Sequence, residues 1–217
     1  MNFSLRSVFH LFACLPLLLI GCAKAESRYS FDKAPFINPG IVQDLSTWIS
    51  DTGDQVVSIN VEDSQKSNRY SVDTKTRAIK GQNPFIYTET ETVESGETNV
   101  ATFGYQLVGK TSSGIYVLEI LNNGGGSGTF RSVMLVKLAS DVGIRVDWEK
   151  GVVGQGKKRL LIKKLGTFEL GDRWDGELRV VGDSIEVGSD RGVFAGTKRG
   201  GKLSQAPKKL LLKIETK

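Results

Sequence analysis

Short segments in which apolar and polar residues alternate recur along most of this chain. The alternation is clearest in three of them, residues 57–61 (VSINV), 144–149 (IRVDWE) and 210–215 (LLLKIE). Successive side chains of a β-strand point to opposite faces, so a period of two is typical of strands with one buried face. The 25 glycines supply the breaks between these segments. The pattern predicts an all-β chain, an antiparallel β-sandwich or jelly roll.

Other stretches are apolar enough to form strands but alternate less clearly. Further strands are expected over residues 70–73, 85–93, 102–108, 115–121, 133–138, 178–181 and 185–187. The run 157–166 (KKRLLIKKLG) suits either a strand or one short helix. Glycine-rich segments such as 122–129 (NNGGGSGT) read as hairpin loops, because glycine adopts the positive φ that such turns need.

One helix is expected near the N-terminal end of the domain. Its apolar face consists of Ile41, Val42, Leu45, Trp48 and Ile49, which recur at helical spacing. Asn38 is a suitable cap before Pro39, which fits the first turn, and residues 50–54 (SDTGD) end the pattern.

The first 21 residues have the layout of a secretory signal. An apolar run over residues 8–20, interrupted only by His10, follows the positive charge of Arg6 and is too short to cross a bilayer as a helix. The segment predicts export and removal before Cys22, the start of a tether over residues 22–38 that leads into a domain over residues 39–217.

The end of this signal, Leu19-Ile20-Gly21-Cys22, resembles the lipobox of bacterial lipoproteins. The resemblance implies that the Cys22 thiol receives a diacylglycerol and that its new amino group is acylated. Ala23 follows where an aspartate commonly retains such proteins at the inner membrane, which implies anchoring at the outer membrane, facing the periplasm. The alternative is ordinary export, with Cys22 incidental.

Loss of the signal removes several chemistries from the mature chain. Cys14 and His10, the chain's only histidine, leave with it, and lipid consumes Cys22. A chain without histidine or a free thiol cannot form disulfides, Ser-His-Asp or Cys-His pairs, or imidazole and thiolate metal sites. No cofactor is therefore expected. Carboxylate pairs and oxygen-ligand calcium sites stay possible.

Residues 87–95 (YTETETVES) hold three carboxylates within one expected strand. Glu89 and Glu91 share a strand face, and Glu94 follows three residues later. The spacing resembles the Glu-x-Asp-x-x-Glu strand of laminarinase-type jelly-roll glycosidases, which implies a nucleophile, a helper and a general acid. Here the middle residue is Glu91 rather than aspartate. The alternative is a solvated edge strand, whose charges prevent pairing with other chains.

Residues 171–177 (GDRWDGE) form an acidic turn around a tryptophan. Asp172, Asp175 and Glu177 could supply oxygen ligands to calcium, and an exposed Trp174 could stack on a sugar. Asp172, Trp174 and Asp175 are accordingly candidate ligand-binding residues. The alternative is an ordinary turn with a core tryptophan.

The last third of the chain is basic. Residues 151–217 hold 15 Lys and Arg against 8 Asp and Glu, whereas residues 22–150 hold 13 against 16. Lys157, Lys158 and Arg159 open the basic third and are candidate contacts for an anionic envelope glycan or an acidic protein; nucleic acid is not expected. The preceding glycines resemble a phosphate-binding loop, but Lys158 replaces the required Ser or Thr. The alternative is a solvated basic face.

Two functions fit these features. The first is a lipid-anchored, non-catalytic module that binds an envelope partner or glycan. The second is a carboxylate-dependent glycan hydrolase that uses Glu89, Glu91 and Glu94. They differ in whether these glutamates line a concave surface close to Trp174 or Trp148.

Overall fold

The fold is mostly β. A computed structural model describes residues 37–47, 49, 53–64, 67–70, 73–79, 81–94, 96–188 and 210–215. The helical elements in these ranges are α1 (Pro39–Thr47), α2 (Val61–Ser64) and the 3-10 turn η1 (Asn68–Tyr70). The strands are β1 (Ser58–Asn60), β2 (Lys75–Arg77), β3 (Phe85–Glu94), β4 (Glu97–Lys110), β5 (Tyr116–Asn123), β6 (Phe130–Asp147), β7 (Val152–Asp172), β8 (Leu178–Val181), β9 (Ser184–Val187) and β10 (Leu210–Lys213).

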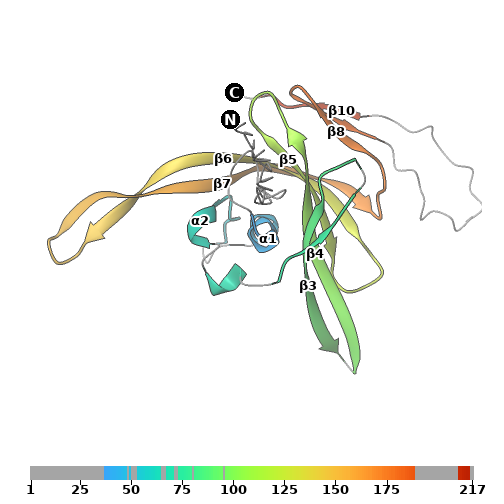
Figure 1. The fold of residues 1–217 in the computed structure, drawn as a ribbon, viewed down its shortest axis with the longest axis horizontal. Coiled ribbons are helices and arrows are strands. Elements are labelled where there is room, and N and C mark those ends of the chain that lie inside the picture. Colours follow the sequence, from blue (N-terminus) through green and yellow to red (C-terminus); the bar gives the residue numbers. More distant parts are fainter. Residues whose placement is uncertain are drawn as a thin grey trace, which may run out of the picture.

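Two antiparallel sheets account for these strands. The large sheet has seven strands in the order β1-β7-β6-β5-β4-β3-β2, and it curls around α1 as a half-barrel (Figure 1). The small sheet has the order β10-β9-β8. The prediction of an antiparallel, mostly β chain with one short N-terminal helix is thus confirmed at this level.

Helix α1 begins where the sequence predicts. The Asn38 side chain accepts a hydrogen bond from the amide of Gly40 at 2.8 Å, as expected of an N-cap. The helix ends at Thr47, earlier than predicted. The Ser46 and Thr47 hydroxyls bond back to carbonyls one turn earlier, an interaction that competes with the helical ladder. Ile49, expected on the helix face, instead lies in an isolated β-bridge and is exposed.

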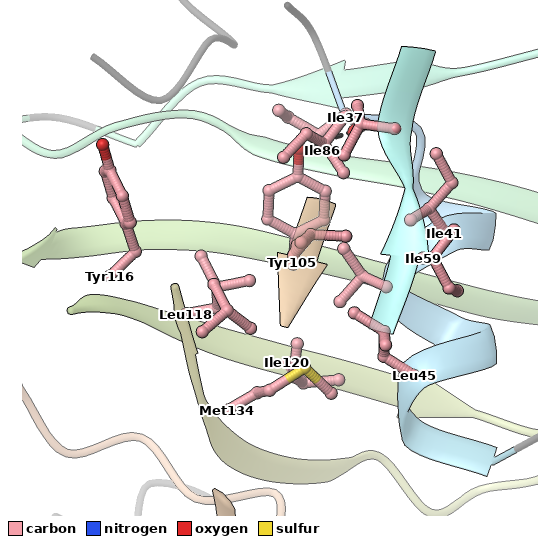
Figure 2. Close-up of a cluster of buried hydrophobic side chains, with 14 of the residues drawn as sticks. Ile37, Ile41, Leu45, Ile59, Ile86, Tyr105, Tyr116, Leu118, Ile120 and Met134 are labelled. Atoms are coloured by element: carbon pink, nitrogen blue, oxygen red, sulfur yellow. Dashed lines mark hydrogen bonds between the residues drawn. The ribbon is translucent and has the colours of Figure 1, made fainter. Parts of the chain in front are cut away.

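The main core lies between α1 and the concave, inner face of the large sheet. Figure 2 shows the Tyr105 ring at its centre, among side chains of α1 and of the neighbouring strands. The Tyr105 hydroxyl donates to the carbonyl of Ile37 at 2.6 Å, so this buried polar group is satisfied. The core includes Ile41, Leu45, Ile59, Ile86, Leu118, Ile120, Met134, Val136 and Ile162.

A second core lies on the opposite, outer face of the large sheet, under the small sheet. Val117 and Val133 pack there against Trp174, Ile185 and Val187. The small sheet approaches closely at Gly109 on β4, where an added Cβ would lie 3.1 Å from the Val180 side chain of β8. Where the small sheet packs on it, the middle of the large sheet is therefore buried on both faces.

Strands β6 and β7 form one long hairpin that extends beyond the body (Figure 1). The sequence predicted two separate strands, at 133–138 and 144–149. The ladder instead continues through register shifts, one of them between Val142 and Ile144. An added Cβ on Gly156 would lie 2.9 Å from the Gly143 carbonyl oxygen, so only glycine allows β6 and β7 to approach this closely at the register shift. The ambiguous run 157–166 lies within β7 and is a strand.

Two smaller predictions are wrong, one strand was missed, and one predicted residue lies outside the described residues. Tyr70, expected in a strand, belongs to η1, where its hydroxyl donates to Asp44 at 2.6 Å. Strand β2 was not expected because its exposed residues (KTR) carry no apolar signal. Val61 begins α2 instead of ending a strand. Trp48 is outside the described residues.

Candidate functional site

Two hollows lie on the outer face of the large sheet, beside the small sheet. Their volumes are about 860 and 660 Å³, and both are lined by Arg131, Trp174 and Asp175. We call the pair the outer groove. The smaller hollow is also lined by Arg77, Phe85, Tyr87, Glu89, Thr102, Leu121, Asn123, Ser127, Thr129 and Arg173, and the larger by Gln106, Glu119 and residues of β8.

Arg131 lies where the two hollows meet. Its guanidinium pairs with the Glu119 carboxylate, and both side chains are largely withdrawn from solvent. It also lies over the Phe85 ring, 5.7 Å from the ring centroid, while Arg77 lies 5.6 Å from the same centroid. The ring is thus approached by two cations, an arrangement that its negative faces favour.

Strand register places these side chains on one face. Arg131 is opposite Leu121, which is opposite Gly104, which is opposite Tyr87. At Gly104 an added Cβ would lie 2.5 Å from the Tyr87 Cβ, so only glycine allows the strands this close approach. The next row along this face brings Glu89, Thr102 and Asn123 together.

The turn after β7 forms the wall between the hollows. Arg173 has a φ of 53°, and its guanidinium donates to the Ser127 carbonyl at 2.6 Å, which ties this turn to the β5–β6 loop. Trp174 is only 6% exposed, so the expected exposed stacking platform is absent, and the tryptophan belongs to the second core. An added Cβ on Gly176 would lie 2.3 Å from the Trp174 ring, so glycine is needed beside it.

The three predicted carboxylates have different surroundings. Glu89 lines the smaller hollow and pairs with Lys75 of β2, which raises the pKa of the Lys75 ammonium. Glu91 shares the strand face but is exposed and does not line the hollow. The Glu94 side chain lies outside the described part of the molecule. Of the two glutamates on this strand face, only Glu89 therefore lines the groove.

The acidic turn does not assemble an ion site. Asp172 accepts a hydrogen bond from the Thr129 amide at 2.8 Å, and Glu177 pairs with Arg179. Asp175 faces the groove. Among the residues that the structure describes, no three His, Cys, Asp or Glu side chains gather so that they could hold a metal ion. The calcium interpretation gains no support.

The predicted basic contacts lie apart from the groove, on the far part of β7. Lys157 and Lys158 are exposed, whereas Arg159 pairs with Asp141 across the hairpin and holds the pKa of that carboxyl below its ordinary value. The structure therefore divides the predicted ligand residues between two regions. The remaining basic residues of 189–209 lie outside the described residues.

Sequence reasoning missed Arg77, Arg131 and Glu119. A signal for Glu119 was present, because it is a lone charge in a strand (YVLEIL) that is otherwise apolar on both faces. A charge in such a place is expected to have a partner, since burying an unpaired carboxylate is costly. Nothing local identified Arg131 as that partner.

No protein-family model, curated protein or solved structure matches this chain. The residues of the lipobox lie outside the described ranges, so the anchor stays a prediction. No helix in the described ranges is long and apolar enough to cross a membrane. The groove itself offers guanidinium groups, carboxylates, aromatic faces, hydroxyls and amides, which together suit a polar, hydroxyl-rich ligand.

Proposed function

We propose that this chain is a lipid-anchored, non-catalytic binding protein of the bacterial cell envelope, held at the outer membrane through Cys22, whose outer groove binds an acidic glycan. The observation that carries the proposal is the outer groove itself. Its two hollows are large enough for a small oligosaccharide and meet at a guanidinium.

Among the arginines that line the groove, Arg77 is the one that favours an anionic sugar over a neutral one, because Arg131, Arg173 and Arg179 each pair with a carboxylate. The Arg77 guanidinium lies over the Phe85 ring and forms no ion pair with any other described residue. A guanidinium binds a carboxylate or phosphate through two parallel hydrogen bonds. Thr102, Asn123 and Thr129 in the same hollow supply partners for sugar hydroxyls.

The body of the protein serves as a sandwich-like scaffold in this proposal. What supports this description is the small sheet, which packs face to face on the large sheet through Trp174, Ile185 and Val187. Side chains held on paired strands are fixed better than side chains on loops, so the groove is largely formed before the ligand arrives.

Binding to the groove is tested by titration with a tetrasaccharide rich in glucuronic acid and with its neutral glucose counterpart. We expect the acidic sugar to bind and Arg77→Gln to weaken it at least tenfold, as for loss of a charged hydrogen bond. Arg145→Gln, which removes an exposed arginine far along β6, is the matched control and should change nothing. Equal affinity for both sugars would refute an anionic ligand.

The anchor is tested separately with Cys22→Ser. The variant should no longer incorporate labelled palmitate and should leave the membrane fraction. If it stays with membranes as the unchanged protein does, the lipobox interpretation is wrong, whatever the groove binds.

A glycan hydrolase that uses Glu89, Glu91 and Glu94 is the second candidate. Only the position of Glu89 in the groove favours it. Glu89 pairs with Lys75, and Glu91 does not line the groove, so the described part of the predicted trio supplies one carboxylate where two-carboxylate hydrolysis needs two. Should the protein cleave an envelope glycan, Glu89→Gln or Glu94→Gln must abolish cleavage; full activity in both would exclude these residues.

A further inference from the structure

The outer part of the β6–β7 hairpin, residues 141–159, extends away from the body (Figure 1), and only its inner end lines a hollow with Asn60 and Asp63. We call it the distal arm. Strand β5 pairs with β6 only up to Val136, and β1 pairs with β7 only over residues 161–163. Neither edge of the distal arm is therefore paired with another described strand.

One face of the distal arm is apolar. Alternation places Val142, Ile144 and Val146 on the same face, and register adds Val153 opposite Val146. Trp148 lies in the turn beyond them and is 86% exposed. An uncovered tryptophan at the end of an apolar row is unusual for a protein surface and indicates a binding surface.

The charges of the arm are arranged around this face. On the opposite face Asp141 pairs with Arg159, and Asp147 lies 3.5 Å from Lys150 and 3.9 Å from Arg145. These carboxylates are thus neutralised within the arm.

The cations next to the apolar face are not neutralised in this way. Lys158 is opposite Val142, with Lys157 next to it, and neither forms an ion pair with any described residue. Glu149, in the turn, is the one carboxylate of the arm that forms no ion pair with a described residue. The apolar face therefore has the available charge of Lys158 at its inner end, and Lys157 lies beside it at the register shift.

We propose that the distal arm lies on the surface of an anionic lipid bilayer, with its apolar face among the headgroups and acyl chain ends. From Val142 to Trp148 the arm extends about 20 Å at strand rise, which suits an element lying in the interface rather than crossing it. Tryptophan is enriched at this depth because its ring is apolar and its N–H is polar. Lys157 and Lys158 lie where anionic headgroups attract them.

This orientation also explains the charged face. The Asp141–Arg159 pair and the Asp147 cluster face water when the opposite face contacts lipid. A membrane fits this strip better than a protein partner does, because the strip is narrow and ends in an exposed tryptophan, and the one acidic side chain in the hollow at its inner end is Asp63. The inference does not depend on the groove.

The test follows Trp148 alone. The full protein is mixed with vesicles of 30% phosphatidylglycerol in phosphatidylcholine, or of phosphatidylcholine only, each containing brominated lipid that quenches nearby tryptophan. The Trp148 signal is the difference between the unchanged protein and Trp148→Phe. Scoring this difference keeps the result independent of lipid on Cys22 and of the groove.

We expect the Trp148 signal to fall at least twofold in the anionic vesicles and much less in the neutral ones. Lys157→Glu with Lys158→Glu should weaken the effect about tenfold in lipid concentration, since each lysine near the surface contributes to the attraction. Lys137→Glu with Lys163→Glu, on the same two strands within the body, is the matched control and should leave it unchanged.

A Trp148 signal that neither vesicle quenches would overturn the proposal. If that result came with a dimer that Ile144→Ser converts to a monomer, the apolar face would be assigned to a second copy of the chain.

Discussion

The two halves of the β6–β7 hairpin have the same alternating sequence pattern but different surroundings. In the inner half, Met134 and Ile162 lie under α1 and are fully buried. In the outer half, Ile144 and Val153 occupy equivalent positions in the pleat and are exposed. The ladder of hydrogen bonds is continuous between them. Strand formation and burial are therefore separate properties in this molecule.

The difference shows what covers the inner half. Helix α1, the start of α2 and the 3-10 turn η1 fill the concave side of the sheet, and their apolar side chains complete the core. Among the described residues, Asn60 and Asp63 line a hollow with the inner end of the outer half, but no residue of 141–159 belongs to either core. An apolar face kept without a cover is evidence of an external contact, because water-exposed valine and tryptophan add nothing to stability.

The largest expected difference between the halves comes from matched isoleucine truncations. Ile162→Ala should lower the free energy of unfolding by about 2–5 kcal/mol, because it leaves a cavity under α1. Ile144→Ala should change it by less than about 0.5 kcal/mol, since its side chain is 76% exposed. Urea unfolding of both variants measures the contrast. Similar losses at both positions would mean that the outer half is covered in solution.

The packing of α1 and η1 over the inner half of the hairpin should become less stable at alkaline pH. Burial raises the pKa of Tyr105, and burial together with the Asp44 hydrogen bond raises the pKa of Tyr70 to about 12. Both folded-state pKa values lie above the pKa of tyrosine in the unfolded chain. The two tyrosines therefore contribute fully to stability below about pH 10, and this contribution is lost as pH rises through their folded-state pKa values. Stability should fall by up to about 1.4 kcal/mol per pH unit for each tyrosine.

Unfolding measured between pH 9 and 12 checks this, with ionisation followed by absorbance at 295 nm. Tyr70→Phe should remove its share of the pH dependence while the distal arm, followed through Trp148, responds little. Ionisation of both tyrosines at pH 10 before unfolding would contradict the buried environment.

Much of the fold was predictable because the signals are local. The cap at Asn38 and strands β3, β8 and β9 depend on neighbouring residues, and they appear where the sequence predicts. The end of α1 and the continuity of β6 were not predictable in this way. The first is decided by hydroxyl groups that bond back to the helix, and the second by the close crossing of Gly143 and Gly156.

The candidate site was less predictable than the fold. Asp175 and Glu89 do line the outer groove, but as parts of two distant segments that the curled sheet brings together. Arg131 and Arg77 have no motif around them, and they become cations of a site only because Phe85 lies between them. Conversely, the exposed tryptophan among the described residues is Trp148 and not Trp174, because burial depends on which sheet covers a residue.

The smallest expected effect concerns the contact that joins β7 to the end of α1. The Lys164 ammonium donates to the carbonyl of Leu45 at 2.5 Å, one of the last carbonyls of the helix, which otherwise lack partners. Desolvation lowers the pKa of Lys164, so part of the gain is offset while the lysine is charged. Lys164→Met should therefore cost only about 1 kcal/mol in urea unfolding at pH 7. Its exposed neighbour is the control, and Lys163→Met should cost nothing measurable. An equal loss in both variants would show that the charge of β7, and not this helix contact, is what stabilises the inner half of the hairpin.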